Sequence, residues 1–341
     1  MYRKSVKIAL VFVSLVIIAG AMVRMTGSGM GCPDWPKCFG YYIPPTEASQ
    51  LEWQPEKSFK KGQVIIKDKT LQVAASDFTT EDYFNSNNWE LYTKHDYAIF
   101  NVWHTWIEYI NRLFGALSGI AILIMAILSF KKWRDRKRIT LLSWLSVVLL
   151  VFQAWLGATV VYSVLSPVKI TIHMVMALVI VAVLLYLLYI SKRKRKNYNV
   201  SHGYKGVLLV ALILSLIQII LGTQVRQFVD EQSTALGYEA KSQWLNDSPL
   251  MFYFHRSFSI LVVMTHIALW YFNRIYNYRL RLVNFLMLVV VVEVLTGLTM
   301  YYFDFPILSQ PLHLIFASLL FGLQFYIVLQ AFQQRNEWKS S

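Results

Sequence analysis

Hydrophobic residues along this chain gather in eight long runs that polar segments separate. Each run has about 20 residues, the length at which an α-helix crosses the hydrocarbon core of a bilayer. The pattern therefore predicts an all-α polytopic membrane protein with eight transmembrane helices. The second run is the longest, which predicts a helix that tilts or begins outside the bilayer. The expected spans are residues 8–25, 100–130, 139–162, 168–190, 206–228, 250–273, 282–303 and 307–332.

Basic residues mark alternate connections between these runs. They cluster in residues 3–7, 131–138, 191–205 and 274–281, whereas the other connections are mixed or acidic. Cytoplasmic loops of membrane proteins carry such an excess of lysine and arginine, so we expect both termini in the cytoplasm. No small-residue cleavage site follows the first run, which therefore predicts a retained helix rather than a removable signal.

Composition supports the membrane assignment. The 341 residues are 56% hydrophobic and 15% charged, which excludes an ordinary soluble domain. A formal net charge of +14 would suggest nucleic-acid binding in a soluble protein. Here the positive charges lie in short loops, where they set the orientation of the helices, and we expect no nucleic-acid partner.

The loop over residues 26–97 is long and is expected on the outer side. A loop of this length favours local structure of its own. Residues 62–73 predict a small hairpin that turns at 67–69, and residues 77–85 predict a short surface helix. The loop can act as a lid over the outer face or as a passive insertion, because surface loops tolerate added length at low cost.

Both cysteines of the chain, Cys32 and Cys38, lie in this loop. The expected outer compartment permits disulfides, so we interpret the pair as a structural bridge that closes a short loop. The functional alternative is a redox-active pair of thiols. Its spacing differs from the oxidoreductase motif, in which two residues separate the cysteines instead of five.

The second half of the chain repeats features of the first. Three positions of the third and fourth spans match positions of the seventh and eighth spans at a constant offset of 140 residues, and a dipeptide of the second span matches one in the sixth. Because each half has four spans that start on the same side, the pattern predicts two parallel-repeat four-helix bundles. The N-terminal bundle is expected over residues 1–196 and the C-terminal bundle over 197–341. The matching residues are Gly20 and Arg24 with Gly222 and Arg226, Asn111 and Arg112 with His255 and Arg256, and Gln153, Gly157 and His173 with Glu293, Gly297 and His313.

The second hydrophobic run contains three polar or charged residues, Glu108, Asn111 and Arg112. Ionisable groups at membrane depth are costly and commonly mark a functional site. Glu108 and Arg112 are four residues apart and can pair on one helix face, and His104 lies two turns outward from Asn111 on the same stripe. The alternative is an ion pair that only locks helix packing.

Three histidines lie at one depth. His173, His255 and His313 are each about five residues inside the outer end of a span, or roughly 8 Å along the helix. Two imidazoles from different helices are what a six-coordinate haem iron needs, so His255 and His313 predict a haem-ligand pair. A hydrogen-bonded pair between helices is the alternative, and a zinc site would need a third ligand. His266, deeper in the sixth span, is interpreted as a packing residue.

The first half lacks the second imidazole of this pair. Asn111 stands where the second half has His255, and Glu108 stands where it has Phe252. An amide is a poor iron ligand. The asymmetry predicts a fixed cofactor in the second bundle and a reacting molecule in the first.

Taken together, these residues resemble the haem A synthase family, and the resemblance spans all eight predicted helices. The family converts haem O to haem A for terminal oxidases by two hydroxylations of a porphyrin methyl and loss of water. The resemblance implies an oxidoreductase of haem biosynthesis in the bacterial cytoplasmic (inner) membrane, with its haem sites near the outer face. Its marks are Glu108 to Arg112, His173-Met174, His255-Arg256, His313-Leu314, and the turn Gly27-Ser28-Gly29 that leads to Cys32 and Cys38.

The resemblance also implies a role for each site residue. His255 and His313 would be the axial ligands of a haem b iron, and Glu108 the catalytic carboxylate with Arg112 beside it. Haem O would bind in the first bundle, with His173 as a candidate ligand of its iron. The substrate-site residues are His173, Asn111 and His104, and the outer disulfide is Cys32 to Cys38.

The chain departs from the family at one of these positions. The family pattern in the second span is Glu-x-x-His-Arg, and Asn111 replaces that histidine. Either His104 substitutes for it, or Asn111 hydrogen-bonds a water that binds the iron. The outer loop is also longer than in compact members of the family.

Two other classes of function remain open from the sequence. A membrane cytochrome could move electrons from quinol without modifying a haem. A transporter with an ion site at Glu108 is the other, although transporter sites commonly lie between broken helices and no breaks are evident here. Haem O and membrane lipid are the expected partners; a haem O synthase, a quinone acceptor and a homo-oligomer are left open.

Overall fold

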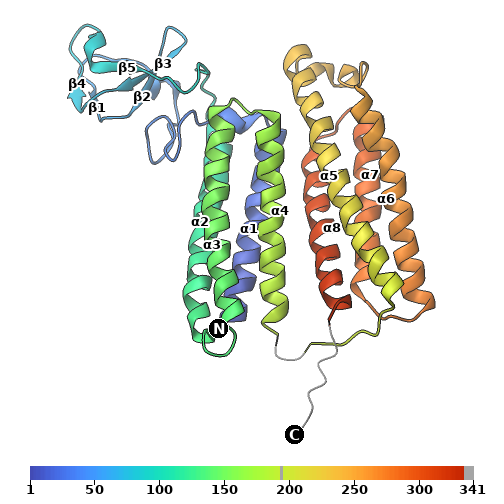
Figure 1. Cartoon of the computed structure of the whole chain (residues 1–341). Coiled ribbons are helices and arrows are strands. Elements are labelled where there is room, and N and C mark those ends of the chain that lie inside the picture. Colours follow the sequence, from blue (N-terminus) through green and yellow to red (C-terminus); the bar gives the residue numbers. More distant parts are fainter. Residues whose placement is uncertain (193–194, 334–341) are drawn as a thin grey trace. The chain divides into compact units, whose positions relative to one another are not determined.

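Eight long helices dominate the computed structural model, which describes residues 1–192 and 195–333 (Figure 1). All eight are long and apolar enough to cross a membrane, and they confirm the eight predicted spans. The helices are α1 (Tyr2–Met25), α2 (Val102–Ser129), α3 (Lys137–Tyr162), α4 (Pro167–Ile190), α5 (His202–Leu236), α6 (Leu250–Ile275), α7 (Leu282–Tyr302) and α8 (Ser309–Ala331).

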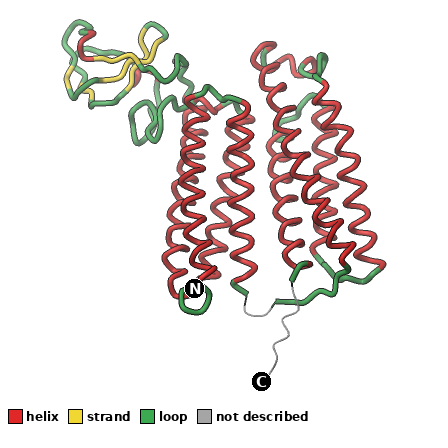
Figure 2. The backbone as a smooth tube through the Cα atoms, in the orientation of Figure 1, coloured by secondary structure: helices red, strands yellow, loops and turns green. Residues whose placement is uncertain are grey.

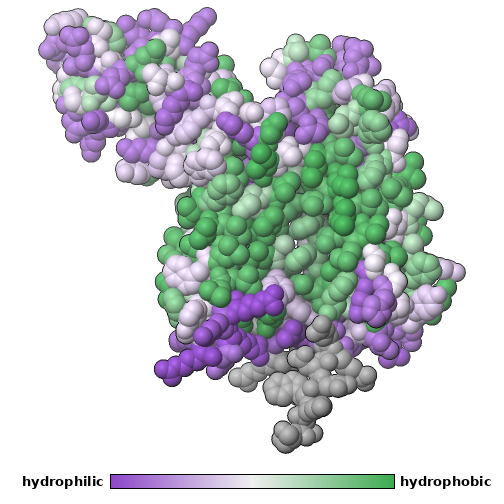
Figure 3. Space-filling model, viewed as in Figure 1, coloured by the Kyte–Doolittle hydropathy of each residue, from purple (hydrophilic) through white to green (hydrophobic). Residues whose placement is uncertain are grey.

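Side-chain caps mark where α2 and α5 begin. The Asn101 side chain accepts the backbone N–H groups of Trp103 and His104 at 2.9 and 3.1 Å, which caps α2. Ser201 caps α5 in the same way through Tyr204. Along their lengths the helices satisfy their own backbone groups, and Figure 3 shows hydrophobic side chains along their middles with hydrophilic ones at their ends. Such a surface suits a lipid solvent.

The chain forms two compact units. One comprises Phe12–Ile120 and Val151–His173, which include the long insertion between α1 and α2 (residues 26–101) and parts of α1 to α4. The other comprises Met1–Val11, Ala121–Leu150 and the chain from Met174 onward, with all of α5 to α8. The two parallel repeats and the boundary at 196/197 stay predictions. Arg193 and Lys194 of the basic connection, and residues 334–341, lie outside the described residues.

Helices α5 to α8 share one hydrophobic core, and His266 of α6 is fully buried. Its Nε2 lies 2.6 Å from the Gln324 side-chain nitrogen, and its Nδ1 lies 2.7 Å from the Val262 carbonyl. Gln324 also donates to Ser215 at 3.0 Å. Both ring nitrogens are therefore satisfied, which confirms His266 as a packing residue and identifies its partner.

The long insertion between α1 and α2 contains all the strands found in the described residues (Figure 2). β2 (Val64–Lys67) and β3 (Thr70–Ala74) form the predicted hairpin, and Asp68 and Lys69 at its turn have φ of 49° and 60°. Positive φ at both central residues is the geometry that a two-residue hairpin requires. β5 (Trp89–Leu91) pairs with the other edge of β3.

The prediction of a helix over residues 77–85 is wrong. Phe78–Thr79 form strand β4, which pairs with β1 (Ser58–Phe59). The Phe78 ring stacks on Phe59 and meets Trp89 edge-on, with centroids 5.9 and 5.2 Å apart. This aromatic packing outweighs the local helical signal, and the helical turn forms instead at Ser86–Asn88.

Candidate functional site

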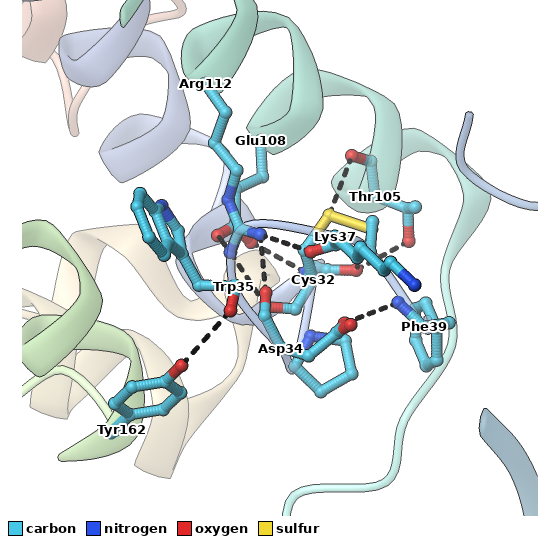
Figure 4. A network of polar contacts seen from close by, with 12 residues as sticks. Cys32, Asp34, Trp35, Lys37, Phe39, Thr105, Glu108, Arg112 and Tyr162 are labelled. Carbon is cyan, nitrogen blue, oxygen red and sulfur yellow. Dashed lines mark hydrogen bonds and ion pairs between the residues drawn. A yellow bond between two sulfur atoms is a disulfide. The ribbon is translucent and has the colours of Figure 1, made fainter. Parts of the chain in front are cut away.

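The Glu108 and Arg112 side chains of α2 form an ion pair, with Glu108 Oε1 and Arg112 Nη2 2.5 Å apart. Glu108 is only 4% exposed. Its second oxygen, Oε2, accepts the backbone N–H of Cys32 at 2.7 Å (Figure 4). Both carboxylate oxygens are therefore fixed, one by the neighbouring turn of α2 and one by the loop that follows α1.

Arg112 also binds the backbone of that loop. Its Nη1 donates to the carbonyls of Asp34 at 2.6 Å and Lys37 at 2.9 Å, and its Nη2 donates to the carbonyl of Cys32 at 3.0 Å. A guanidinium presents several N–H donors in one plane, so a single arginine can hold these groups at once. The sequence pattern predicted the pair with Glu108 and carried no signal for the three carbonyls.

The loop itself is closed by a disulfide between Cys32 and Cys38, as predicted. Inside it the Asp34 carboxylate accepts the N–H groups of Phe39 at 2.5 Å and Gly40 at 2.8 Å. Burial raises the pKa of Asp34 above its usual value, and these N–H groups and Arg112 oppose that shift. We call residues 31–38 the disulfide loop.

Side chains from three other segments bind further carbonyls of the disulfide loop. Thr105 of α2 donates to Gly31 at 2.8 Å, and Tyr92 donates to Pro33 at 2.9 Å. The Nε2 of His95 also lies 2.9 Å from the Pro33 carbonyl. Tyr162 at the end of α3 donates to the Trp35 carbonyl at 3.4 Å (Figure 4). The segment after the small sheet thus helps to fix the disulfide loop, a role that sequence reasoning missed.

The predicted substrate-site residues lie in the same unit. Asn111 faces Gly20 of α1, where a Cβ would lie 3.8 Å from its Oδ1, and His173 faces Gly157 of α3, where a Cβ would lie 3.3 Å from its Cε1. Asn111 Oδ1 and His173 Nδ1 are buried without a hydrogen-bond partner. His104 is in the first turn of α2, about 10 Å along the helix axis from Asn111. No contact in the described part of the chain joins these two side chains.

The second half brings His255 of α6 and His313 of α8 together. Their ring centroids are 6.5 Å apart and their planes make an angle of 77°. Each ring again faces a glycine of the preceding helix, since a Cβ at Gly222 would lie 3.1 Å from His255 and one at Gly297 would lie 3.7 Å from His313. All four positions at the predicted ligand level therefore pack against a glycine.

A carboxylate fixes one of these imidazoles. Glu293 Oε2 lies 3.0 Å from His313 Nδ1, and Thr296 Oγ1 lies 2.9 Å from the same nitrogen. This contact favours a proton on Nδ1 and leaves Nε2 to bind a metal, which is the usual support of a metal-ligating histidine. The sequence noted Glu293 only as the counterpart of Gln153, which instead donates to the His173 carbonyl at 2.9 Å.

The paired histidines fit a haem. His255 and His313 would each supply one imidazole nitrogen to the iron of such a group, and their rings lie 6.5 Å apart between centroids. Within the described residues no group of three or more His, Cys, Asp or Glu side chains forms a metal site, and a haem iron needs only two such ligands from the protein.

Comparison with known proteins identifies the family. Residues 4–325 match the COX15-CtaA family, described as cytochrome oxidase assembly protein. The chain belongs to this family. It is 25% identical to the Heme A synthase of Wolbachia sp. subsp. Brugia malayi over 94% of both chains. It is also 25% identical to that of Shouchella clausii, over 93% of this chain and 92% of the relative.

A third relative, the Heme A synthase of Shewanella oneidensis, is 27% identical. That match covers 63% of this chain and 54% of the relative, so the chain spans about half the length of that protein. Family membership confirms the resemblance expected from the sequence. The protein is an integral membrane oxidoreductase of haem A biosynthesis.

Proposed function

We propose that this protein oxidises one methyl group of haem O to the formyl group of haem A by two hydroxylations. Each hydroxylation takes its oxygen from water and releases two protons and two electrons, and the resulting gem-diol loses water to give the formyl group. The difference between the two halves carries the proposal. The first half contains Glu108, which pairs with Arg112, together with Asn111 and a single histidine, His173. In the second half two histidine rings, those of His255 and His313, lie beside each other.

The second half is proposed to hold a haem b as a permanent cofactor. His255 and His313 would bind its iron, and Glu293 would keep the second imidazole in the ligating tautomer. When bound, a bis-histidine haem supplies electron transfer, here from the reacting site toward an acceptor such as a quinone. The glycines of α5 and α7 leave the room in which the two rings lie.

Glu108 is the proposed catalytic carboxylate. Removing electrons from the conjugated substrate develops positive charge at the methyl carbon. A carboxylate that is already fixed in a water-poor site stabilises that charge without reorganising. Such a group lowers the barrier because its interaction grows as the charge develops. The 4% exposure of Glu108 and the bonds to both of its oxygens support this assignment.

The substrate haem is proposed to bind more weakly than the cofactor. His173 is the candidate ligand of its iron, and Asn111 replaces the second imidazole with an amide. One histidine with an amide holds iron less firmly than two histidines, which suits a substrate that enters and a product that leaves. Because His104 lies two turns away, an amide–water arrangement at Asn111 is favoured over replacement by His104.

Haem extraction tests the reaction. The chain is expressed with a haem O synthase as the source of substrate, and the haems are separated by chromatography. The wild type should yield haem A, and Glu108→Ala should retain haem b and yield none. Glu231→Ala, which removes an exposed carboxylate of α5, is the matched control. Haem A formation by Glu108→Ala at the wild-type rate would exclude the catalytic role.

Haem retention tests the assignment of the two halves. His255→Ala or His313→Ala should abolish the tightly held haem b, whereas His173→Ala should spare it and impair turnover. If Glu108→Ala lost that haem while His255→Ala kept it, the two sites would be assigned to the wrong halves. A pure electron-transfer cytochrome would keep haem b and form no haem A in the wild type.

A further inference from the structure

We propose that Arg112 is a positioning residue that docks the disulfide loop onto α2 and so fixes the Glu108 carboxylate. This inference rests on the proposed function, because it assigns to Glu108 the catalytic role. The guanidinium of Arg112 donates its hydrogen bonds to other groups of the protein. Three of its contacts are backbone carbonyls of the disulfide loop, and the fourth is Glu108.

The contacts form a closed circuit. Arg112 holds the carbonyl of Cys32, and the N–H of Cys32 holds Glu108 Oε2. Arg112 also holds Glu108 Oε1 directly. One guanidinium therefore fixes one carboxylate oxygen itself and the other through the loop that it anchors. Loss of the docked loop would leave the carboxylate with one partner and freedom to rotate.

The repeat-related arginine shows what this position looks like without such a loop. Arg256 follows His255 as Arg112 follows Asn111, but Arg256 is exposed and its guanidinium lies over the Tyr301 ring, 5.0 Å from the centroid. The Arg112 side chain is only 13% exposed. Its half also carries the carboxylate, so the docking arrangement accompanies Glu108.

Gly31 provides a way to lift the loop without changing either charged residue. A Cβ at Gly31 would lie 2.4 Å from the backbone C and O of His104 and 2.7 Å from the N of Thr105. Such distances require the loop or the first turn of α2 to move. Gly31→Ala should therefore shift the disulfide loop away from α2. At Gly115, on the same helix, a Cβ meets open space, so Gly115→Ala is the matched control.

The first measurement is the rate at which a water-soluble phosphine reduces the disulfide, followed by maleimide labelling. Cys32 and Cys38 are 0% and 1% exposed, so reduction in the wild type should be slow. Arg112→Lys should accelerate the reduction several-fold, because the ammonium of lysine lacks the planar fork of donors with which the guanidinium binds three carbonyls. Gly31→Ala should do the same, whereas Arg256→Lys and Gly115→Ala should leave the rate unchanged. Unchanged rates in both test variants would overturn the docking role.

The second measurement separates positioning from binding. In Gly31→Ala the kcat for haem A formation should fall about tenfold, because misplacing a catalytic group by a fraction of an ångström slows the chemical step. KM for haem O should change less than about twofold, because the substrate-iron side of the site is untouched. The haem b spectrum, retained at wild-type intensity, shows that the variant folds.

The outcomes are distinguishable. Faster reduction of the disulfide with an unchanged kcat would overturn the positioning role and leave the proposed function intact. A rise in KM alone would identify the loop as part of the substrate-binding surface and also overturn it. A wild type that made no haem A would overturn the proposed function, and with it the catalytic part of the inference, while the reduction rates would still decide whether Arg112 docks the loop.

Discussion

At the scale of single residues, the buried histidines differ in the hydrogen-bond partners of their ring nitrogens. His313 has a carboxylate on Nδ1 at 3.0 Å, whereas the buried Nδ1 atoms of His255 and His173 have no partner. An anionic partner makes an imidazole a stronger donor to a metal and stabilises the oxidised metal. The two proposed haem ligands are therefore unequal, and Glu293 is the source of the difference.

Replacing that carboxylate should change the potential of the proposed haem b. In Glu293→Gln the cofactor should be retained and its midpoint potential should rise by on the order of 50 mV, because the reduced iron loses less than the oxidised iron when the negative charge is removed. A spectroscopic redox titration measures the shift. Glu231→Gln is the control, since that carboxylate is exposed on α5. An unchanged potential would separate Glu293 from haem ligation.

The buried carboxyl of Asp34 predicts a pH dependence. Burial raises its pKa, so the folded protein binds this proton more tightly than the unfolded chain does. The associated stability is fully present below the unfolded pKa of about 3.9 and is lost as the pH rises through the higher folded pKa. The melting temperature of the wild type relative to Asp34→Asn should therefore increase as the pH falls from about 7 to about 4.

Thermal unfolding of both proteins in detergent gives that difference. The Asn variant removes the titration and keeps one carbonyl acceptor for the N–H groups of Phe39 and Gly40. The opposite slope would mean that those N–H groups and Arg112 outweigh burial in setting the pKa of Asp34.

At the scale of helices, the glycines control how closely neighbours approach the ligand rings. In Gly222→Ala the new Cβ would lie 3.1 Å from His255 Cε1, so α5 or the ring must give way by a few tenths of an ångström. Haem b should then be lost several-fold faster to an apomyoglobin acceptor. Gly206→Ala on the same helix adds a methyl to open space and should leave the rate unchanged. Equal rates would show that the His255 position tolerates the closer neighbour.

Elements differ in how far the sequence predicted them. The apolar runs located all eight helices, because length and hydropathy are local properties that a bilayer selects directly. The hairpin at residues 64–74 was also predicted from its own turn. The strand at Phe78 was missed because its partners, Phe59 and Trp89, are distant in sequence, and a local helical signal could not compete with their packing.

At the scale of the whole molecule, the orientation in the membrane is a prediction of the basic loops. A cysteine introduced at Lys60, in the long insertion between α1 and α2, should react with a membrane-impermeant maleimide in intact cells. One introduced at Lys132, in the basic connection after α2, should react only after the membrane is opened. The native cysteines form a disulfide and do not interfere. Reversed accessibility would place the histidines near the cytoplasmic face.

The sequence by itself determined the class of the protein, its eight helices and its family. These follow from hydropathy and from short motifs, which are properties of neighbouring residues. Only the tertiary structure decided that Arg112 donates hydrogen bonds to three carbonyls of the disulfide loop and that Glu293 contacts His313. Backbone carbonyls are the same in every residue, and helix rotation decides which side chains meet, so no sequence pattern specifies these partners.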